Sequence, residues 1–185
     1  MFDAPASKCG FTLIELLVTI AVLAIVLSIA VPSFQDMARR NRLTSETNNL
    51  VSALAIARSE AIKRGSVVTV CKTSNPDAAT PTCASGASWA DGWIVFTDTG
   101  TRGTVDGTDV RLKIQQPAGT NGPTVTPSAS FANFVSYAAA GAAVASNSIR
   151  DLPTTGSFTV CINSVSRLVD VGLSGRVSTT VGVCP

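Results

Sequence analysis

A single carboxylate, that of Glu15, stands near the start of a long apolar run. From residue 16 to residue 35 the sequence carries no charge, and about 20 helical residues are enough to cross the hydrocarbon core of a bilayer. A carboxylate at that depth is costly unless it is paired, so Glu15 is a candidate functional residue. The alternative is that Glu15 only marks the edge of the membrane.

The residues before the apolar run do not match a cleaved secretory signal. Such a signal has a positive N-terminal region and a small-residue cleavage site after the apolar core. Here Asp3 offsets Lys8, and no small-residue site follows the run. The run is therefore interpreted as an anchor that stays in the protein.

The segment from Lys8 to Glu15 reads Lys-Cys-Gly-Phe-Thr-Leu-Ile-Glu. It resembles the class III signal of type IV pilins and type II secretion pseudopilins. The resemblance implies that residues 1–10 are a leader, which prepilin peptidase removes on the cytoplasmic side by cutting after Gly10. It also implies methylation of the new N-terminal Phe11, so the mature chain would comprise residues 11–185.

Elementary electrostatics explains the spacing in this motif. Cleavage creates an ammonium group at Phe11, and methylation keeps its charge. Glu15 lies one helical turn away, within reach of that ammonium or of the same group in a neighbouring subunit. The pairing is strong where water is excluded. In the family this carboxylate recruits the next subunit into the filament, and we expect the same role for Glu15.

The interior of the sequence resembles one group of minor pilins and pseudopilins, the FimT/FimU/GspH group. The resemblance runs in order through most of the chain, and the loops are its variable part. The matching residues are 41–43 (Asn-Arg-Leu), 57–65 (Ala-Arg-Ser-Glu-Ala-Ile-Lys-Arg-Gly), 89–98 (Trp-Ala-Asp-Gly-Trp-Ile-Val-Phe-Thr-Asp), Gly103, Asp106, Leu112, Cys161, 175–177 (Gly-Arg-Val) and Cys184.

This resemblance implies a minor pilin that joins other minor pilins and the major pilin in the priming or tip complex of a type IV pilus. The chain would cross the inner membrane once, with its head in the periplasm, before assembly into a cell-surface pilus. Two alternatives stay open. One is a DNA-binding minor pilin for DNA uptake, and the other is a minor pseudopilin of a type II secretion system.

The cysteines point to disulfides in the exported head. Cys9 leaves with the leader, and Cys71, Cys83, Cys161 and Cys184 remain, an even number in an oxidising space. Three pairings are possible; Cys71–Cys83 and Cys161–Cys184 are favoured because each pair flanks one local segment. Free thiols or a metal site are the alternatives, but C-x₂-C spacing and histidine are both absent.

Charge gives little support to DNA binding. The head, residues 66–185, has seven basic and seven acidic residues, whereas residues 36–65 carry a net charge of +3. DNA-uptake members of the family have a C-terminal Gly-Arg-x-Arg motif, but here Ser178 replaces its second arginine. Arg176 and Arg167 are the candidate DNA-binding residues. Arg167 would compensate from an adjacent strand, although Asp170 opposes it.

The hydrophobic pattern predicts an α+β protein with a long helix packed on an antiparallel β head, and the resemblance implies that this is the type IV pilin fold. The helix covers residues 11–65: about residues 11–34 span the membrane, Pro32 weakens the backbone locally, and an amphipathic half follows with Glu46 among its polar residues. The head covers residues 66–185. Strands are predicted at 67–71, 93–97, 110–114, 131–137, 157–162, 167–171 and 176–180, with loops at 75–88, 99–108, 117–127 and 138–147.

Catalytic chemistry is not expected. Without histidine there is no Ser-His-Asp or Cys-His arrangement, so we predict no enzyme activity, no cofactor and no metal. Asp98, Asp106 and Asp109 stand among glycines and suggest Ca²⁺, but turn formation explains them more simply. Trp89 and Trp93 are interpreted as core residues rather than as platforms for a sugar or a base.

Overall fold

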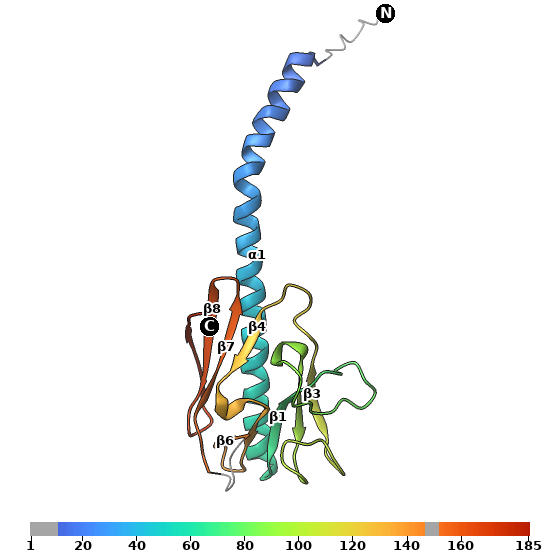
Figure 1. The fold of residues 1–185 in the computed structure, drawn as a ribbon, viewed down its shortest axis with the longest axis vertical. Coiled ribbons are helices and arrows are strands. Elements are labelled where there is room, and N and C mark those ends of the chain that lie inside the picture. Colours follow the sequence, from blue (N-terminus) through green and yellow to red (C-terminus); the bar gives the residue numbers. More distant parts are fainter. Residues whose placement is uncertain (1–10, 147–151) are drawn as a thin grey trace, which may run out of the picture. The chain divides into compact units, whose positions relative to one another are not determined.

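The computed structural model describes residues 11–146 and 152–185. Its one long helix, α1, runs from Leu13 to Arg64 (Figure 1). The basic side chains of Lys63 and Arg64 in the last turn suit the negative end of the helix dipole. Gly65 follows with a φ of 63°, and the amide of Ser66 donates to the carbonyl of Ala61 at 3.3 Å. This glycine-terminated motif ends α1.

The chain divides at residue 39 into two compact units. The described part of the first unit, residues 11–39, contains the apolar half of α1, and its side chains are almost all exposed. The second unit, from Arg40 to Pro185, holds the rest of α1 and all nine described strands.

Two antiparallel sheets build the head, rather than one. The five-stranded sheet has the order β3-β2-β1-β5-β6, and the four-stranded sheet has the order β4-β7-β8-β9. The strands are β1 (Val68–Lys72), β2 (Trp93–Thr97), β3 (Arg111–Gln115), β4 (Thr124–Pro127), β5 (Phe134–Tyr137), β6 (Ala143–Ala145), β7 (Gly156–Ile162), β8 (Val165–Val171) and β9 (Val177–Val181). Figure 1 shows β7 and β8 running along the C-terminal half of α1.

The main core lies between this half of α1 and both sheets. Leu50, Leu54 and Ala57 of the helix are fully buried in it, together with Val70 and Val160 of the two sheets. These three helix residues lie at helical spacing, so this half of α1 buries one apolar face, as an amphipathic helix should. The core fixes the sheets to the helix.

A second, smaller core covers the outer face of the five-stranded sheet. Because side chains alternate along a strand, Val70 of β1 faces the helix while Cys71 faces away from it. Cys71, Ile94 and Phe96 are buried on this face, and Cys83 and Val105 pack on them from the loops after β1 and β2. These two loops therefore form an outer layer of the head.

The fold class expected from the sequence is confirmed, but two predicted loops contain strands. β4 lies within 117–127 and β6 within 138–147, of which residue 147 is outside the described residues. A short 3-10 helix, Ala129–Phe131, also occupies the start of the strand predicted at 131–137. Tertiary pairing accounts for the two strands, since β4 pairs with β7 and β6 with β5.

Candidate functional site

The N-terminal end of α1 presents Glu15 in its first turn. The Thr12 hydroxyl accepts a hydrogen bond from the Glu15 amide at 3.3 Å, and the Thr12 carbonyl accepts one from the Leu16 amide at 3.2 Å. Thr12 is therefore the N-cap, and a glutamate three residues later follows the capping-box pattern. Sequence reasoning missed Thr12, although the Thr-x-x-Glu spacing could have revealed it.

Glu15 and Phe11 are both exposed, with Phe11 at 79%. Of the two residues of the predicted processing site, Phe11 is described and Gly10 lies outside the described residues. No described side chain forms an ion pair with Glu15. Its carboxylate is thus open to a group from elsewhere, which is what a contact with another subunit requires.

The apolar half of α1 leaves its large side chains uncovered. Among the described helices it is the one long and apolar enough to cross a membrane. Leu16, Ile25 and Phe34 are between 58% and 71% exposed. An apolar surface of this size needs lipid or a protein partner. Pro32 lies inside α1, and the helix continues through it.

Two disulfides hold the head. Cys71 bonds to Cys83 and Cys161 bonds to Cys184, with Cα–Cα separations of 5.6 Å and 5.7 Å. The first ties the outer layer of the head to β1. The second ties the segment after β9 to β7. These are the two pairings that the sequence favoured, because each pair of cysteines flanks one local segment.

The aspartates after β2 act as turn formers. Asp109 accepts hydrogen bonds from the amides of Thr99 at 2.9 Å and Asp106 at 3.1 Å, and Asp106 accepts one from the Thr101 amide at 3.0 Å. Burial alone would raise the pKa of Asp109, but these hydrogen bonds outweigh it and lower the pKa. Among the described residues no cluster of acidic, cysteine or histidine side chains could hold a metal ion.

Two carboxylates are buried in the second unit, and the sequence predicted the burial of neither. Glu46, expected on the polar face of α1, is only 5% exposed, and its Oε1 has no described hydrogen-bond partner. Asp98 is 6% exposed at the end of β2, and it accepts hydrogen bonds from the Thr69 hydroxyl at 2.6 Å and the Gly103 amide at 2.8 Å. Burial raises the pKa of both carboxyl groups.

Both tryptophans belong to the main core. Trp89 is 1% exposed; its ring lies 6.5 Å from that of Trp93 and meets the ring of Phe158 edge-on at 4.8 Å. Phe158 also stacks on Phe131 at 5.6 Å. The cluster joins the loop before β2 to β7. Neither indole is available as a stacking platform for a ligand.

The two candidate DNA-binding arginines are not brought together. Arg176 precedes β9 at the β8–β9 turn, whereas Arg167 pairs across the hairpin with Val181 at the other end of β9. At about 3.3 Å per residue they are more than 10 Å apart along the strands. A cleft of about 560 Å³ contains Arg176, but Asp170 lines it as well.

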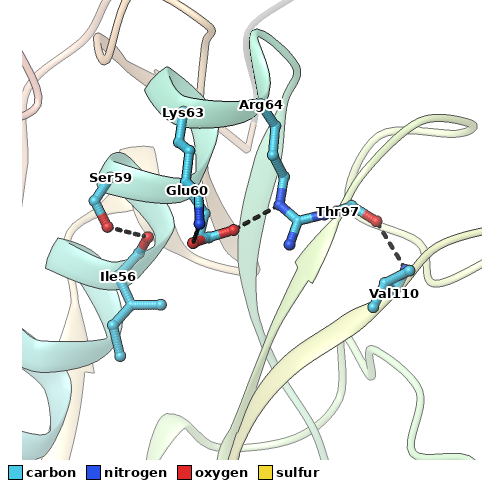
Figure 2. A network of polar contacts seen from close by, with 7 residues as sticks. All are labelled: Ile56, Ser59, Glu60, Lys63, Arg64, Thr97 and Val110. Carbon is cyan, nitrogen blue, oxygen red and sulfur yellow. Dashed lines mark hydrogen bonds and ion pairs between the residues drawn. The ribbon is translucent and has the colours of Figure 1, made fainter.

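The basic end of α1 is partly neutralised. Figure 2 shows Lys63 and Arg64 converging on Glu60, with N–O distances of 3.7 Å and 2.6 Å. The hydrogen bond from Arg64 holds the pKa of Glu60 below its ordinary value. In the same view Val110 donates its amide to the Thr97 hydroxyl at 2.8 Å, which closes the base of the loop after β2.

Comparison with sequence families gives two matches. The family described as Type II transport protein GspH matches residues 46–175, and the Prokaryotic N-terminal methylation motif matches residues 5–31. A "Fimbrial protein" of Pseudomonas aeruginosa is 43% identical over 56 residues, which is 30% of this chain. The match spans 36% of that relative's length, well under half of it.

Solved structures with a similar fold include the type IV minor pilin FimU of Pseudomonas aeruginosa strain PAO1. It superimposes with a TM-score of 0.55 and 18% identity, covering 80% of this chain and 92% of FimU. A second crystal form of FimU gives the same TM-score at 17% identity and covers 77% and 100%. At these identities the likeness shows the fold alone.

A capped, uncovered apolar helix that continues into a disulfide-bonded β head defines a membrane-anchored pilin, a structural protein rather than an enzyme. Within that class, the family match over residues 46–175 is decisive. The chain belongs to the GspH family of type IV minor pilins and pseudopilins. Membership implies processing by prepilin peptidase and interaction with other pilins.

Proposed function

We propose that this chain is a minor pilin of the priming or tip complex of a type IV pilus. In this proposal, prepilin peptidase removes residues 1–10, the new N-terminus at Phe11 is methylated, and about residues 11–34 anchor the chain in the inner membrane. The head, residues 66–185, faces the periplasm and selects partner pilins. The assembled complex is then carried to the cell surface.

The observation that carries the proposal is the exposed, unpaired Glu15 beside Phe11 in an uncovered apolar helix. A carboxylate in lipid is costly until it meets a cation. The ammonium of a neighbouring mature pilin is such a cation. Assembly therefore relieves a penalty that the free subunit carries, and Glu15 becomes the residue that couples insertion to recruitment. Pro32 would allow α1 to loosen locally as subunits pack.

The test compares Glu15→Ala with Asp36→Ala in cells that make the filament. Asp36 is the matched control because it is an exposed acid on the same helix, paired 3.2 Å from Arg39. Mass spectrometry should find residues 1–10 removed and Phe11 methylated in both variants. Only Glu15→Ala should be missing from sheared filaments. Glu15→Ala in filaments at the wild-type level would refute its assembly role.

The priming role has its own readout. Loss of a priming subunit should lower the number of filaments per cell while leaving their length unchanged, because priming acts only at initiation. Labelled head should be found at filament ends. A distribution along the whole shaft would contradict this part of the proposal and leave the role of Glu15 standing.

A second candidate function is a minor pseudopilin of a type II secretion system. The description of the matching family, Type II transport protein GspH, favours it, whereas the 56-residue match to a fimbrial protein favours a pilus. Deletion separates the two: a pseudopilin mutant loses secretion of exported enzymes and keeps its surface pili. DNA capture by Arg176 and Arg167 stays a prediction, and their separation and the charge of Asp170 do not favour it.

A further inference from the structure

The edge strands of the head differ in how well they are protected. Unpaired strand edges pair with other chains unless charge, proline or shortness prevents it. In the five-stranded sheet, β3 carries Arg111 and Lys113, and β6 is three residues long. In the four-stranded sheet, β4 ends in Pro127. β9 has none of these features.

β9 and the residues after it form an exposed, uncharged edge. From residue 177 to residue 183 the sequence reads Val-Ser-Thr-Thr-Val-Gly-Val, without charge or proline. Val181 is 77% exposed and Val183 is 88% exposed. Four of the five residues of β9 are exposed on both faces of the sheet. β-branched residues of this kind favour strand pairing.

The hydrogen-bond pattern shows which backbone groups of β9 are unused. The Gly172 amide donates to the Arg176 carbonyl at 2.9 Å, so this opposed pair is hydrogen-bonded. In an antiparallel ladder such pairs alternate, so Ser178 and Thr180 bond to β8. Val177, Thr179 and Val181 point their amides and carbonyls away from β8, and they have no partner among the described residues.

A groove continues this edge toward α1. It has a volume of about 260 Å³, and Val51, Ala55 and Ile62 of α1 and Val177 form its apolar part, while Arg58, Ser59 and Arg176 supply polar side chains to its lining. Ile62 is 49% exposed. The four-stranded sheet thus stops one strand short of covering this flank of the helix.

We propose that β9 is a docking edge for β9 of a second copy of this chain, paired antiparallel about Thr179. The order Val-Ser-Thr-Thr-Val places Val177 opposite Val181 of the copy and Thr179 opposite itself. These are the three residues with unused amides and carbonyls, so each opposed pair exchanges both backbone hydrogen bonds. The edge is therefore complementary to itself in register as well as in composition.

The side chains agree with this register. Ser178 faces Thr180 of the copy, a pair of hydroxyl side chains that is favourable across strands. Val181 of the copy lies beside Val177 at the mouth of the groove and extends its apolar lining. Arg176 faces Gly182 of the copy, so no like charges meet. A partner of other sequence would need to reproduce all three pairings: hydroxyl with hydroxyl, valine with valine, and arginine with an uncharged residue.

The orientation determines where the contact forms. Because β8 runs along α1 and β9 is antiparallel to β8, pairing about Thr179 turns the two heads in opposite directions. Neighbours related by the symmetry of one filament point the same way. The contact therefore joins copies that two facing surfaces present, such as the ends of separate filaments.

The test uses the full chain in phosphatidylcholine vesicles with the heads outside, and it follows vesicle clustering by light scattering. Wild-type vesicles should cluster, and Thr179→Pro should abolish clustering because proline removes an outward amide and leaves the bonds to β8 intact. Thr179→Val is the matched control, since it keeps the amide and should cluster like wild type. Thr179→Lys gives a second edge-blocking variant if the proline variant does not fold.

A crosslink identifies the register. A photo-reactive residue at position 180 should capture residue 178 of a differently tagged copy, and Thr179→Pro should lower the yield at least tenfold. Clustering unchanged by both Thr179→Pro and Thr179→Lys would overturn the proposal. So would the absence of clustering in wild type, or a crosslink that maps to a segment other than 176–182.

Discussion

Thr69 of β1 donates its hydroxyl hydrogen to the carboxylate of Asp98, across 2.6 Å and within the buried outer part of the head. Its one hydrogen is thereby used, so Ser136 of β5, at 2.7 Å from the Thr69 hydroxyl, donates to it in turn. One short chain of hydrogen bonds thus joins β5, β1 and the loop after β2.

Asp98 should make the stability of the head depend on pH. Since burial raises its pKa, the folded protein holds this proton more tightly than the unfolded chain does. The protonated Asp98 carboxyl contributes its full stabilisation below the ordinary carboxyl pKa of about 3.9. This stabilisation is lost as the pH rises through the raised pKa of Asp98 in the folded protein. The fluorescence of Trp89 and Trp93, both in the core, reports unfolding. From about pH 4 upward, Asp98→Asn should gain stability relative to wild type. Plots of unfolding free energy against pH that run parallel for the two proteins would contradict this.

Gly103 should tolerate alanine less well than Gly107. Both have positive φ, 74° and 47°, but a Cβ at Gly103 would collide with the Phe134 ring, while Gly107 faces open space. We expect Gly107→Ala to cost about 1 kcal/mol from backbone strain alone. Gly103→Ala should cost roughly 2 kcal/mol more, because overpacking adds to the strain. Equal losses in urea unfolding would show that the loop moves aside.

Arg58 should stabilise the turns that it joins. Its Nε donates to the carbonyls of Gly141 at 3.1 Å and Ser174 at 3.2 Å, so it links α1 to the β5–β6 and β8–β9 turns. Arg58→Lys should lose about 1 kcal/mol, since an ammonium cannot reproduce this planar contact. Arg64→Lys is the control, because its ion pair is exposed and little change is expected. Equal losses of stability in Arg58→Lys and Arg64→Lys would show that Arg58 does not hold the two turns to α1.

Removal of the Cys71–Cys83 bond should loosen the outer layer. With 12 residues of separation, the loop-closure model gives a loss of roughly 3 kcal/mol for the double variant Cys71→Ala and Cys83→Ala. Hydrogen exchange should rise first in the loop after β1 and leave α1 protected. A wild-type exchange pattern in the variant would show that Ile94 and Phe96 hold this layer without the bond.

The sequence predicted elements well where local pattern and tertiary structure agree. The strand predicted at 93–97 is β2 itself, since its aromatic and β-branched residues favour a strand and are buried on both faces. β4 was missed because Pro123 and Pro127 read as turn residues, yet its pairing with β7 makes it a strand. β6 was missed because alanine has little strand preference, although β5 holds it in place.

Of the candidate functional residues, too, the sequence revealed some and missed others. Glu15 was identifiable because a charge interrupts an apolar run, a signal that sequence contains in full. The burial of Asp98 was not, because a loop covers it only after folding, and its sequence neighbours favoured a turn over a Ca²⁺ site. Glu46 was misplaced on the polar face of α1, since the helical pattern does not show how widely the two sheets enclose the helix.

The Cys161–Cys184 bond has a mechanical consequence. A filament under tension pulls on any protein held at β9, and an edge strand with a free end opens one hydrogen bond at a time. Here the end beyond β9 is fastened covalently to β7. The load must then shear the whole β8–β9 ladder at once instead of peeling β9 from its free end.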